Sequence, residues 1–159
     1  MGKREIVFDT ETTGFEAWGD DRITEIGAIE IIDLLPTGRS FHCYCHPRRD
    51  ISERVTQVTG ITIKLLEDAG AKDFKDNAQD FLDFIGADPL VAHNADFDRN
   101  FINAELERAG FDRIPAKRFT DTLKIARAKF PGSPASLDAL CRRFDISLAG
   151  RDTHGAIID

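Results

Sequence analysis

Two acidic side chains close the first apolar run of the chain, two positions apart. The run Val7-Phe8-Asp9-Thr10-Glu11 puts Asp9 and Glu11 on the same side of a strand, because successive side chains of a β-strand alternate between faces. Two carboxylates held about 6.5–7 Å apart on a strand repel each other, and hard oxygen ligands of this kind suit Mg²⁺ or Mn²⁺. A pair of solvated acids at a strand end would give the same pattern. The pair therefore predicts a metal site only if other segments supply further ligands.

A third acid, Asp98, lies in the run H-N-A-D-F-D at 93–98, directly after a short apolar run at 90–92. Ligands of open α/β sheets bind at the carboxyl ends of strands, and Asp98 follows such an end, as Asp9 and Glu11 do. The alternatives are structural. Asn94 or Asp96 could cap a helix, and the helix dipole favours an acid in the first turn without any function.

The segment T-H-G-A-I-I-D at 153–159 supplies His154 and Asp159. Five residues turn about 500° around a helix, so the two side chains would point about 140° apart if both were helical. They converge only if His154 lies in a loop before the helix and Asp159 on its second turn, and Gly155 permits such a loop. Four carboxylates and one imidazole are thus expected at strand or helix ends.

The elements that must position these groups follow from hydrophobic periodicity and turn signals. Strands are expected at 5–9, 22–32 and 41–45, the last after a turn at Pro36-Thr37-Gly38, and such short links favour an antiparallel meander. Later segments alternate as helix 74–85, strand 89–92, helix 96–109, strand 119–122 leading into a helix through 129, and helix 136–144. This alternation implies parallel strands with helices packed on the sheet. The prediction is an α/β fold whose mixed five-stranded sheet, an antiparallel meander plus parallel strands, is flanked by helices as in ribonuclease H-like folds.

The composition fits one soluble domain covering residues 1–159, with a formal net charge of −7. No stretch approaches the about 20 apolar residues that cross a bilayer, and the N-terminus lacks the apolar region of a signal peptide. A cytoplasmic location without membrane contact is therefore expected. An acidic chain holds nucleic acid weakly through phosphate contacts alone. The charge disfavours a stand-alone nucleic-acid-binding module, but it is compatible with a metal-dependent phosphodiesterase.

Three ordered motifs carry a family resemblance. The runs D-T-E-T-T-G at 9–14, H-N-A-D-F-D at 93–98 and H-G-A-I-I-D at 154–159 resemble the DEDDh (DnaQ-like) group of 3′–5′ exonucleases. The runs T-E-I-G-A at 24–28, F-H-C-Y at 41–44 and S-L-D-A-L-C at 136–141 are similar to the proofreading (epsilon) subunits of bacterial DNA polymerase III. The resemblance covers essentially the whole chain.

The resemblance implies three kinds of site residue. The metal ligands, which would hold two divalent cations (Mg²⁺ or Mn²⁺), are Asp9, Glu11, Asp98 and Asp159. The general base that takes a proton from water is His154. The residues that would contact the terminal nucleotide are Gly14, Phe15 and Phe97. One departure is Thr59, which stands where the family usually has a histidine and weakens an expected contact to that nucleotide.

The implied activity releases nucleoside 5′-monophosphates from single-stranded or mispaired DNA 3′ ends, as proofreading for a replicative polymerase. The implied partners are the catalytic subunit of DNA polymerase III and its sliding clamp, through a C-terminal region beyond Asp159, where the chain is expected to be truncated. Two alternatives stay open. One is an exoribonuclease of the same group, distinguished by how it meets the 2′-hydroxyl. The other is a non-catalytic adaptor of the same fold that binds a polymerase or clamp.

Overall fold

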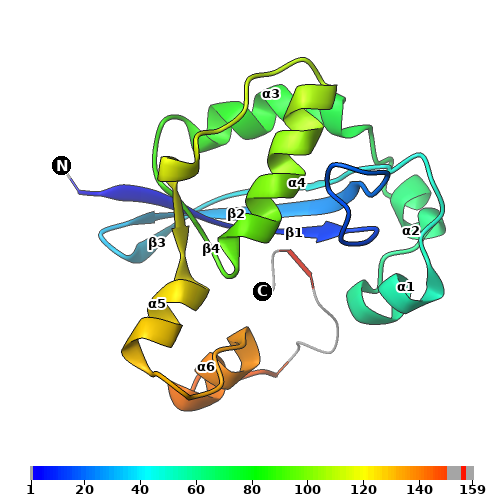
Figure 1. Cartoon of the computed structure of the whole chain (residues 1–159). Helices are drawn as coiled ribbons and strands as arrows, with labels where there is room; N and C mark the ends of the chain where they lie inside the picture. The colour runs from blue at the N-terminus through cyan, green and yellow to red at the C-terminus, as the bar shows by residue number, and fades with distance from the viewer. Residues whose placement is uncertain (1, 150–154, 157–159) are drawn as a thin grey trace.

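The first strand lies at the centre of a mixed five-stranded sheet (Figure 1). The structure is a computed structural model that describes residues 2–149 and 155–156. An antiparallel meander is formed by β1 (Arg4–Thr12), β2 (Ile23–Ile32) and β3 (Leu35–Tyr44). Two strands continue the sheet in parallel, β4 (Leu90–Ala92) beside β1 and β5 (Phe119–Asp121) beside β4. The order β3-β2-β1-β4-β5 confirms the predicted α/β fold with a mixed sheet.

Helices follow the meander and then alternate with the parallel strands. They are α1 (Glu53–Thr59), α2 (Ile63–Asp68), α3 (Phe74–Ile85), α4 (Ala95–Arg108), α5 (Thr122–Lys129) and α6 (Leu137–Arg143), with a short 3₁₀ turn at Ala116–Arg118. Helices α3 and α4 lie together on one side of the sheet, whereas α5 and α6 lie toward the other (Figure 1). Among the described residues, no helix is both long and apolar enough to cross a membrane.

The main core fills the space between the sheet and helices α3 and α4. Strand β1 contributes Ile6 and Phe8, α3 contributes Phe81, and α4 contributes Phe101 and Leu106, all of them buried. Burying a large apolar side chain of this kind stabilises the fold by about 1.5–3 kcal/mol. The core therefore holds α4, which follows β4, firmly against β1.

The hairpin between β2 and β3 turns earlier than predicted. Asp33 and Leu34 are the turn residues, both in the left-handed region at φ 50° and 67°. Two such residues form the tight turn whose twist matches that of the flanking strands. The expected turn at Pro36-Thr37-Gly38 is wrong, because these residues lie within β3. Leu34 is an unusual choice for positive φ, so the sequence carries little signal for the true turn.

Two short helices, α1 and α2, were not predicted from periodicity. Helix α1 has clear end signals, since the Ser52 side chain accepts a hydrogen bond from the Val55 backbone N–H at 3.3 Å. At its other end Gly60 adopts φ 72° and donates its N–H to the Thr56 carbonyl. Each helix spans about two turns or fewer, which is too short for an apolar repeat to emerge.

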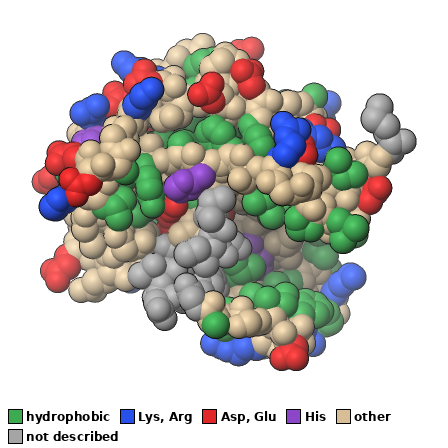
Figure 2. All heavy atoms as spheres, turned by 180° about the vertical axis from the view of Figure 1, so that it is seen from behind, with side chains coloured by type: hydrophobic (Ala, Val, Ile, Leu, Met, Phe, Trp, Pro, Cys, Tyr) green, Lys and Arg blue, Asp and Glu red, His purple; other side chains and the backbone are tan. Residues whose placement is uncertain are grey.

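The second face of the sheet is incompletely covered in the described part of the chain. A cavity of about 840 Å³ separates β1, β2 and β4 from α5 and α6. Its lining is mainly apolar and includes Val7, Ile29, Val91, Leu137 and Ala156. Figure 2 views the molecule from this side, where apolar side chains surround the hollow. The last described residues therefore lie at the border of this hollow.

Candidate active site

The carboxyl ends of β1 and β4 bring two sequence motifs to one edge of the sheet. The strands run parallel, with Ile6 paired with Leu90 and Val7 with Val91. Asp9 and Glu11 lie on β1 just beyond this pairing, and Asp98 lies in the first turn of α4, six residues after β4 ends. Parallel strands end at the same edge, which is the ligand-binding edge of open α/β sheets.

Asp98 is locked onto β1 by a pair of hydrogen bonds. Its Oδ1 accepts the Thr10 backbone N–H at 3.1 Å and the Thr10 hydroxyl at 2.8 Å. The residue is only 2% exposed. Burial, followed by the negative charge of the nearby Asp9, raises the pKa of Asp98 well above the ordinary value. Two carboxylates are thus held close together in a place where each disfavours the charge of the other.

Helix capping does not account for this arrangement of acids. Asn94 precedes α4 with a left-handed backbone at φ 66°, and its side chain makes no capping hydrogen bond. Its backbone N–H instead bonds to Asp121 Oδ1 at 3.0 Å. Asp96 forms surface ion pairs with Arg99 and Lys124. Asp98, by contrast, turns inward to β1, so its position is not explained by stabilisation of the helix end.

Glu11 has a second acid directly across the sheet. In the antiparallel register, Glu11 on β1 faces Glu25 on β2, and both are largely buried. Asp9 faces Gly27, which adds no side chain to the same face. Asp9 also lines the cavity between the sheet and α5 and α6, while Glu11 faces another acid across the two strands.

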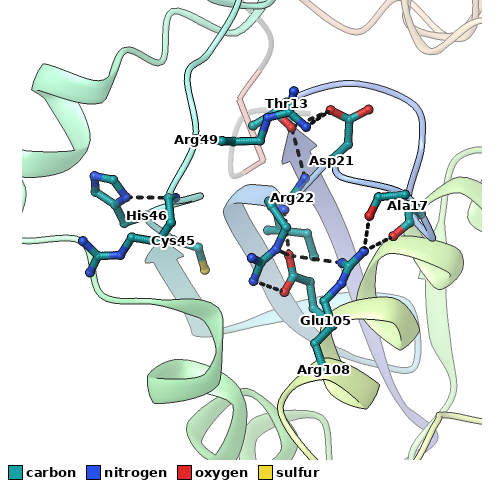
Figure 3. Close-up of polar contacts among 12 residues, drawn as sticks. Thr13, Ala17, Asp21, Arg22, Cys45, His46, Arg49, Glu105 and Arg108 are labelled. Carbon is teal, nitrogen blue, oxygen red and sulfur yellow. Dashed lines mark hydrogen bonds and ion pairs between the residues drawn. The ribbon is translucent and has the colours of Figure 1, made fainter.

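The loop between β1 and β2 is braced by polar contacts (Figure 3). Asp21 accepts hydrogen bonds from the Thr13 hydroxyl at 2.8 Å and the Glu16 backbone N–H at 3.0 Å. A Cβ at Gly14 would lie 2.3 Å from Asp21 Oδ2, so a larger residue at this position would displace the Asp21 carboxylate from its hydrogen bonds. On the far side of the loop, Arg108 of α4 donates to the carbonyls of Ala17 and Gly19 at 2.8 and 2.7 Å.

An ion pair under the same loop joins α4 to the start of β2. Arg22 donates two hydrogen bonds to Glu105, at 2.6 and 2.7 Å, and the Ile23 backbone N–H adds a third at 3.2 Å (Figure 3). A two-pronged arginine–carboxylate pair fixes both distance and orientation. The loop that follows Glu11 is therefore tied to α4 at two places, in its middle at Ala17 and Gly19 and where it enters β2 at Arg22.

The residues expected to contact a nucleotide lie beside this braced loop. Phe15 is 84% exposed and approaches Phe97 edge-on, with ring centroids 6.2 Å apart. Phe97 in turn packs on Phe101 of the core at 5.0 Å. Phe97 is one residue from Asp98 and Phe15 is four from Glu11. An exposed aromatic surface thus adjoins the acids.

Two expected site residues, His154 and Asp159, lie outside the described part of the chain. Between them in sequence, Ala156 is buried, and its backbone N–H bonds to Glu25 Oε2 at 3.1 Å. Residue 156 also borders the cavity against β1 and β2. Ala156 therefore meets the sheet on β2, the strand next to Asp9 and Glu11.

Comparison with protein families now adds to this geometry. The exonuclease family model RNase_T matches residues 6–159. The chain belongs to this exonuclease family. Among curated relatives, the DNA polymerase III subunit epsilon of Rickettsia felis is 45% identical over 159 residues, covering 98% of this chain and 69% of the relative. The epsilon subunit of Buchnera aphidicola subsp. Acyrthosiphon pisum is 48% identical over 164 residues, covering 99% and 68%. The predicted DnaQ-like 3′–5′ exonuclease family and the likeness to epsilon subunits are confirmed.

Solved structures agree with this family. Exonuclease X in complex with 5′-overhanging duplex DNA matches with a TM-score of 0.71 and 26% identity, over 91% of this chain and 75% of that one. Exonuclease I of E. coli in complex with a dT13 oligonucleotide matches with a TM-score of 0.84 over 99% of this chain and 38% of that one. At 19% identity, the second likeness supports the fold alone.

DEDD exonucleases bind metal ions, and the donors of this exonuclease suit them. Asp9, Glu11 and Asp98 supply carboxylate oxygens, the ligands preferred by hard divalent cations. The raised pKa of Asp98 beside Asp9 is the electrostatic condition that a bound cation relieves. Within 2–149 and 155–156, no three His, Cys, Asp or Glu side chains are grouped closely enough to hold an ion by themselves. The described acids have the chemistry that a divalent cation prefers, but by themselves they do not complete a metal site.

The structure adds site residues that the motifs did not single out. Thr10 anchors Asp98, Asp21 and Arg108 brace the loop, and Glu25 contacts the C-terminal segment. Thr10 lies within the first motif, so its position offered a signal. Glu25 lies in the T-E-I-G-A run at 24–28, and Asp21 contacts residues only five and eight positions away. The contacts of Arg108 to Ala17 and of Glu25 to Ala156 join residues 91 and 131 positions apart, and periodicity or spacing gives no indication of them.

Proposed function

We propose that this exonuclease removes nucleoside 5′-monophosphates from mispaired or single-stranded DNA 3′ ends by two-metal-ion hydrolysis. The observation that carries the proposal is the placement of Asp98 against β1 beside Asp9, at the carboxyl edge of the sheet. A buried acid beside a second carboxylate is costly unless a cation joins the two. The ligand set is Asp9, Glu11, Asp98 and Asp159, and the ions are Mg²⁺ or Mn²⁺.

The carboxylates and His154 have different roles in the proposed hydrolysis of the phosphodiester. A pair of divalent ions, when bound, stabilises the attacking and leaving oxygens of an in-line displacement. The Asp98 carboxylate is held in advance by its two hydrogen bonds from Thr10, so it needs little reorganisation on binding a cation. His154 takes the proton of the attacking water, a task suited to an imidazole that titrates near neutrality.

Phe15 and Phe97 would bind the terminal nucleotide by stacking. Phe15 and Phe97 present ring faces and edges beside the acids, and base–aromatic stacking tolerates any base. Gly14 lets the backbone pass close to the sugar, while Asp21 holds the loop in place. A site of this kind reads a frayed end rather than a sequence, as proofreading requires.

Partners follow from the curated relatives, which are epsilon subunits of DNA polymerase III. We infer that this chain acts in the same assembly, close to the polymerase subunit that extends the primer and to the sliding clamp. Residues 1–159 would form a single catalytic domain located in the cytoplasm.

A primer–template with one mismatched 3′ nucleotide tests the proposal. With Mg²⁺ or Mn²⁺ the protein should release the mismatched residue as a 5′-monophosphate faster than a paired one, and EDTA should stop the reaction. A matched RNA primer serves as the comparison for the exoribonuclease alternative. Faster hydrolysis of RNA than of DNA, or no metal-dependent release from either, would contradict the proposed function.

A further inference from the structure

Glu25 is a buried acid that the proposed chemistry does not use. It lies on β2 directly opposite Glu11 and is 6% exposed. Like charges facing each other across two strands destabilise a sheet, and withdrawing a carboxylate from water adds to that cost. A carboxylate in such a place needs hydrogen-bond donors that stabilise its charge.

Each oxygen of Glu25 has a partner of its own. His42 of β3 contacts Oε1 through Nε2 at 2.7 Å, and the His42 ring packs edge-on against Tyr44 with centroids 4.9 Å apart. The Ala156 backbone N–H donates to Oε2 at 3.1 Å. With both oxygens engaged, the carboxylate is held between His42 of β3 and the Ala156 backbone.

The bond to Ala156 spans 131 residues of sequence and reaches the middle of the C-terminal motif. Ala156 follows His154 by two residues and precedes Asp159 by three. We propose that Glu25 is a positioning residue, whose carboxylate holds the Ala156 backbone and thereby sets where His154 and Asp159 meet the acids of β1. This inference rests on the proposed function, in which His154 is the base and Asp159 a ligand.

Two variants test the proposal, Glu25→Ala and Glu25→Gln, in the release of mononucleotides from a single-stranded DNA oligonucleotide at saturating Mn²⁺. Outer partners of ligand-bearing segments typically change activity by about 10–100-fold. Glu25→Ala should lower kcat within that range and leave KM little changed, because Glu25 does not contact Phe15 or Phe97. Glu25→Gln keeps an oxygen that accepts the Ala156 N–H, so it should recover a large part of the lost kcat.

Glu30→Gln is the matched control, because Glu30 is also a buried, ion-paired acid on β2 but lies near the opposite end of the strand. It should lower Tm without lowering kcat. Hydrogen exchange at the Ala156 amide gives a readout that does not depend on activity. Glu25→Ala should speed this exchange, whereas Glu30→Gln should not.

The outcomes separate this inference from the proposed function. Normal kcat in a folded Glu25→Ala protein, or unchanged exchange at Ala156, would overturn the positioning role. Activity retained by Asp9→Ala would overturn the proposed site instead, and the exchange measurement would still decide whether Glu25 holds Ala156. A fall in kcat that Glu25→Gln does not relieve would show that the Ala156 bond is not the cause, and the proposal would fail.

Discussion

Buried acids at the two ends of β1 have opposite surroundings. At the amino end, Arg4 pairs with Glu30 and with Asp88, and Arg39 adds a second pair to Glu30 at 3.0 Å. At the carboxyl end, Asp98 accepts hydrogen bonds from the uncharged Thr10 and lies beside the charge of Asp9. One strand thus carries a neutralised cluster at one end and an acidic cluster at the other.

The pKa shifts run in opposite directions at these ends. Hydrogen bonds from Arg4 and then Thr37 lower the pKa of Glu30, so its charge contributes to folding. Burial and Asp9 raise the pKa of Asp98, so its charge opposes folding. The amino end is built for stability. The carboxyl end holds an unfavourable arrangement that a ligand can relieve, which is a common feature of functional sites.

The largest effect should come from Asp9→Ala. Asp9 is a proposed ligand of the two metal ions. Removing its carboxylate should weaken metal binding, so mononucleotide release should fall to background. Tm should stay level or rise, because the charge that opposes Asp98 is gone. Activity assays and thermal unfolding measure the two effects, with Glu30→Gln as the opposite case. Substantial activity in Asp9→Ala would contradict the proposal that the carboxyl end of β1 is the active site.

His154→Ala should have the next largest effect. Losing a positioned base typically slows a reaction by about 10²–10⁴-fold, while the carboxylates should still bind Mn²⁺. Calorimetry and kcat together check this expectation. His46→Ala is the control, since His46 accepts a hydrogen bond from the Arg48 backbone away from the acids. Loss of Mn²⁺ binding in His154→Ala would contradict its role as a base.

Arg108→Ala should have a smaller effect, and mainly on KM. Without the donors to Ala17 and Gly19, the loop that carries Phe15 should loosen, and the oligonucleotide should bind more weakly. Arg118→Ala is a matched control at the other end of the sheet, because Arg118 also donates to backbone carbonyls, those of Gly86 and Asp88. An equal rise in KM in both variants would show that loop bracing is not specific to the site.

The smallest expected effect is the pH dependence of the stability contributed by Asp98, measured as Tm in the presence of EDTA. Because the folded-state pKa of Asp98 is raised, its charge destabilises the fold above that pKa, and the penalty fades as pH falls toward the ordinary carboxyl value near 4. Asp98→Asn keeps an acceptor for Thr10 and removes the charge. It should therefore raise Tm at neutral pH and lose this advantage near pH 4. A lower Tm at neutral pH would mean that the Asp98 charge stabilises the fold.

The sequence predicted the parts of the fold that rest on local patterns. The α3 helix was predicted at its observed bounds, because its apolar repeat is long and regular. The common edge of Asp9, Glu11 and Asp98 follows from β-α-β alternation, which forces parallel strands. Contacts such as Glu25 to Ala156 depend on strand register and on closure over more than a hundred residues. No local pattern encodes such contacts, so they emerge only in the folded chain.

Calorimetric titration with Mn²⁺, in the presence of a nucleoside 5′-monophosphate at neutral pH, tests most directly whether the carboxyl end of β1 is a metal centre. Two ions per chain should bind to the unaltered protein, and Asp9→Ala should lose them while Glu30→Gln keeps both. Binding that is absent from the unaltered protein, or that survives Asp9→Ala unchanged, would contradict the account.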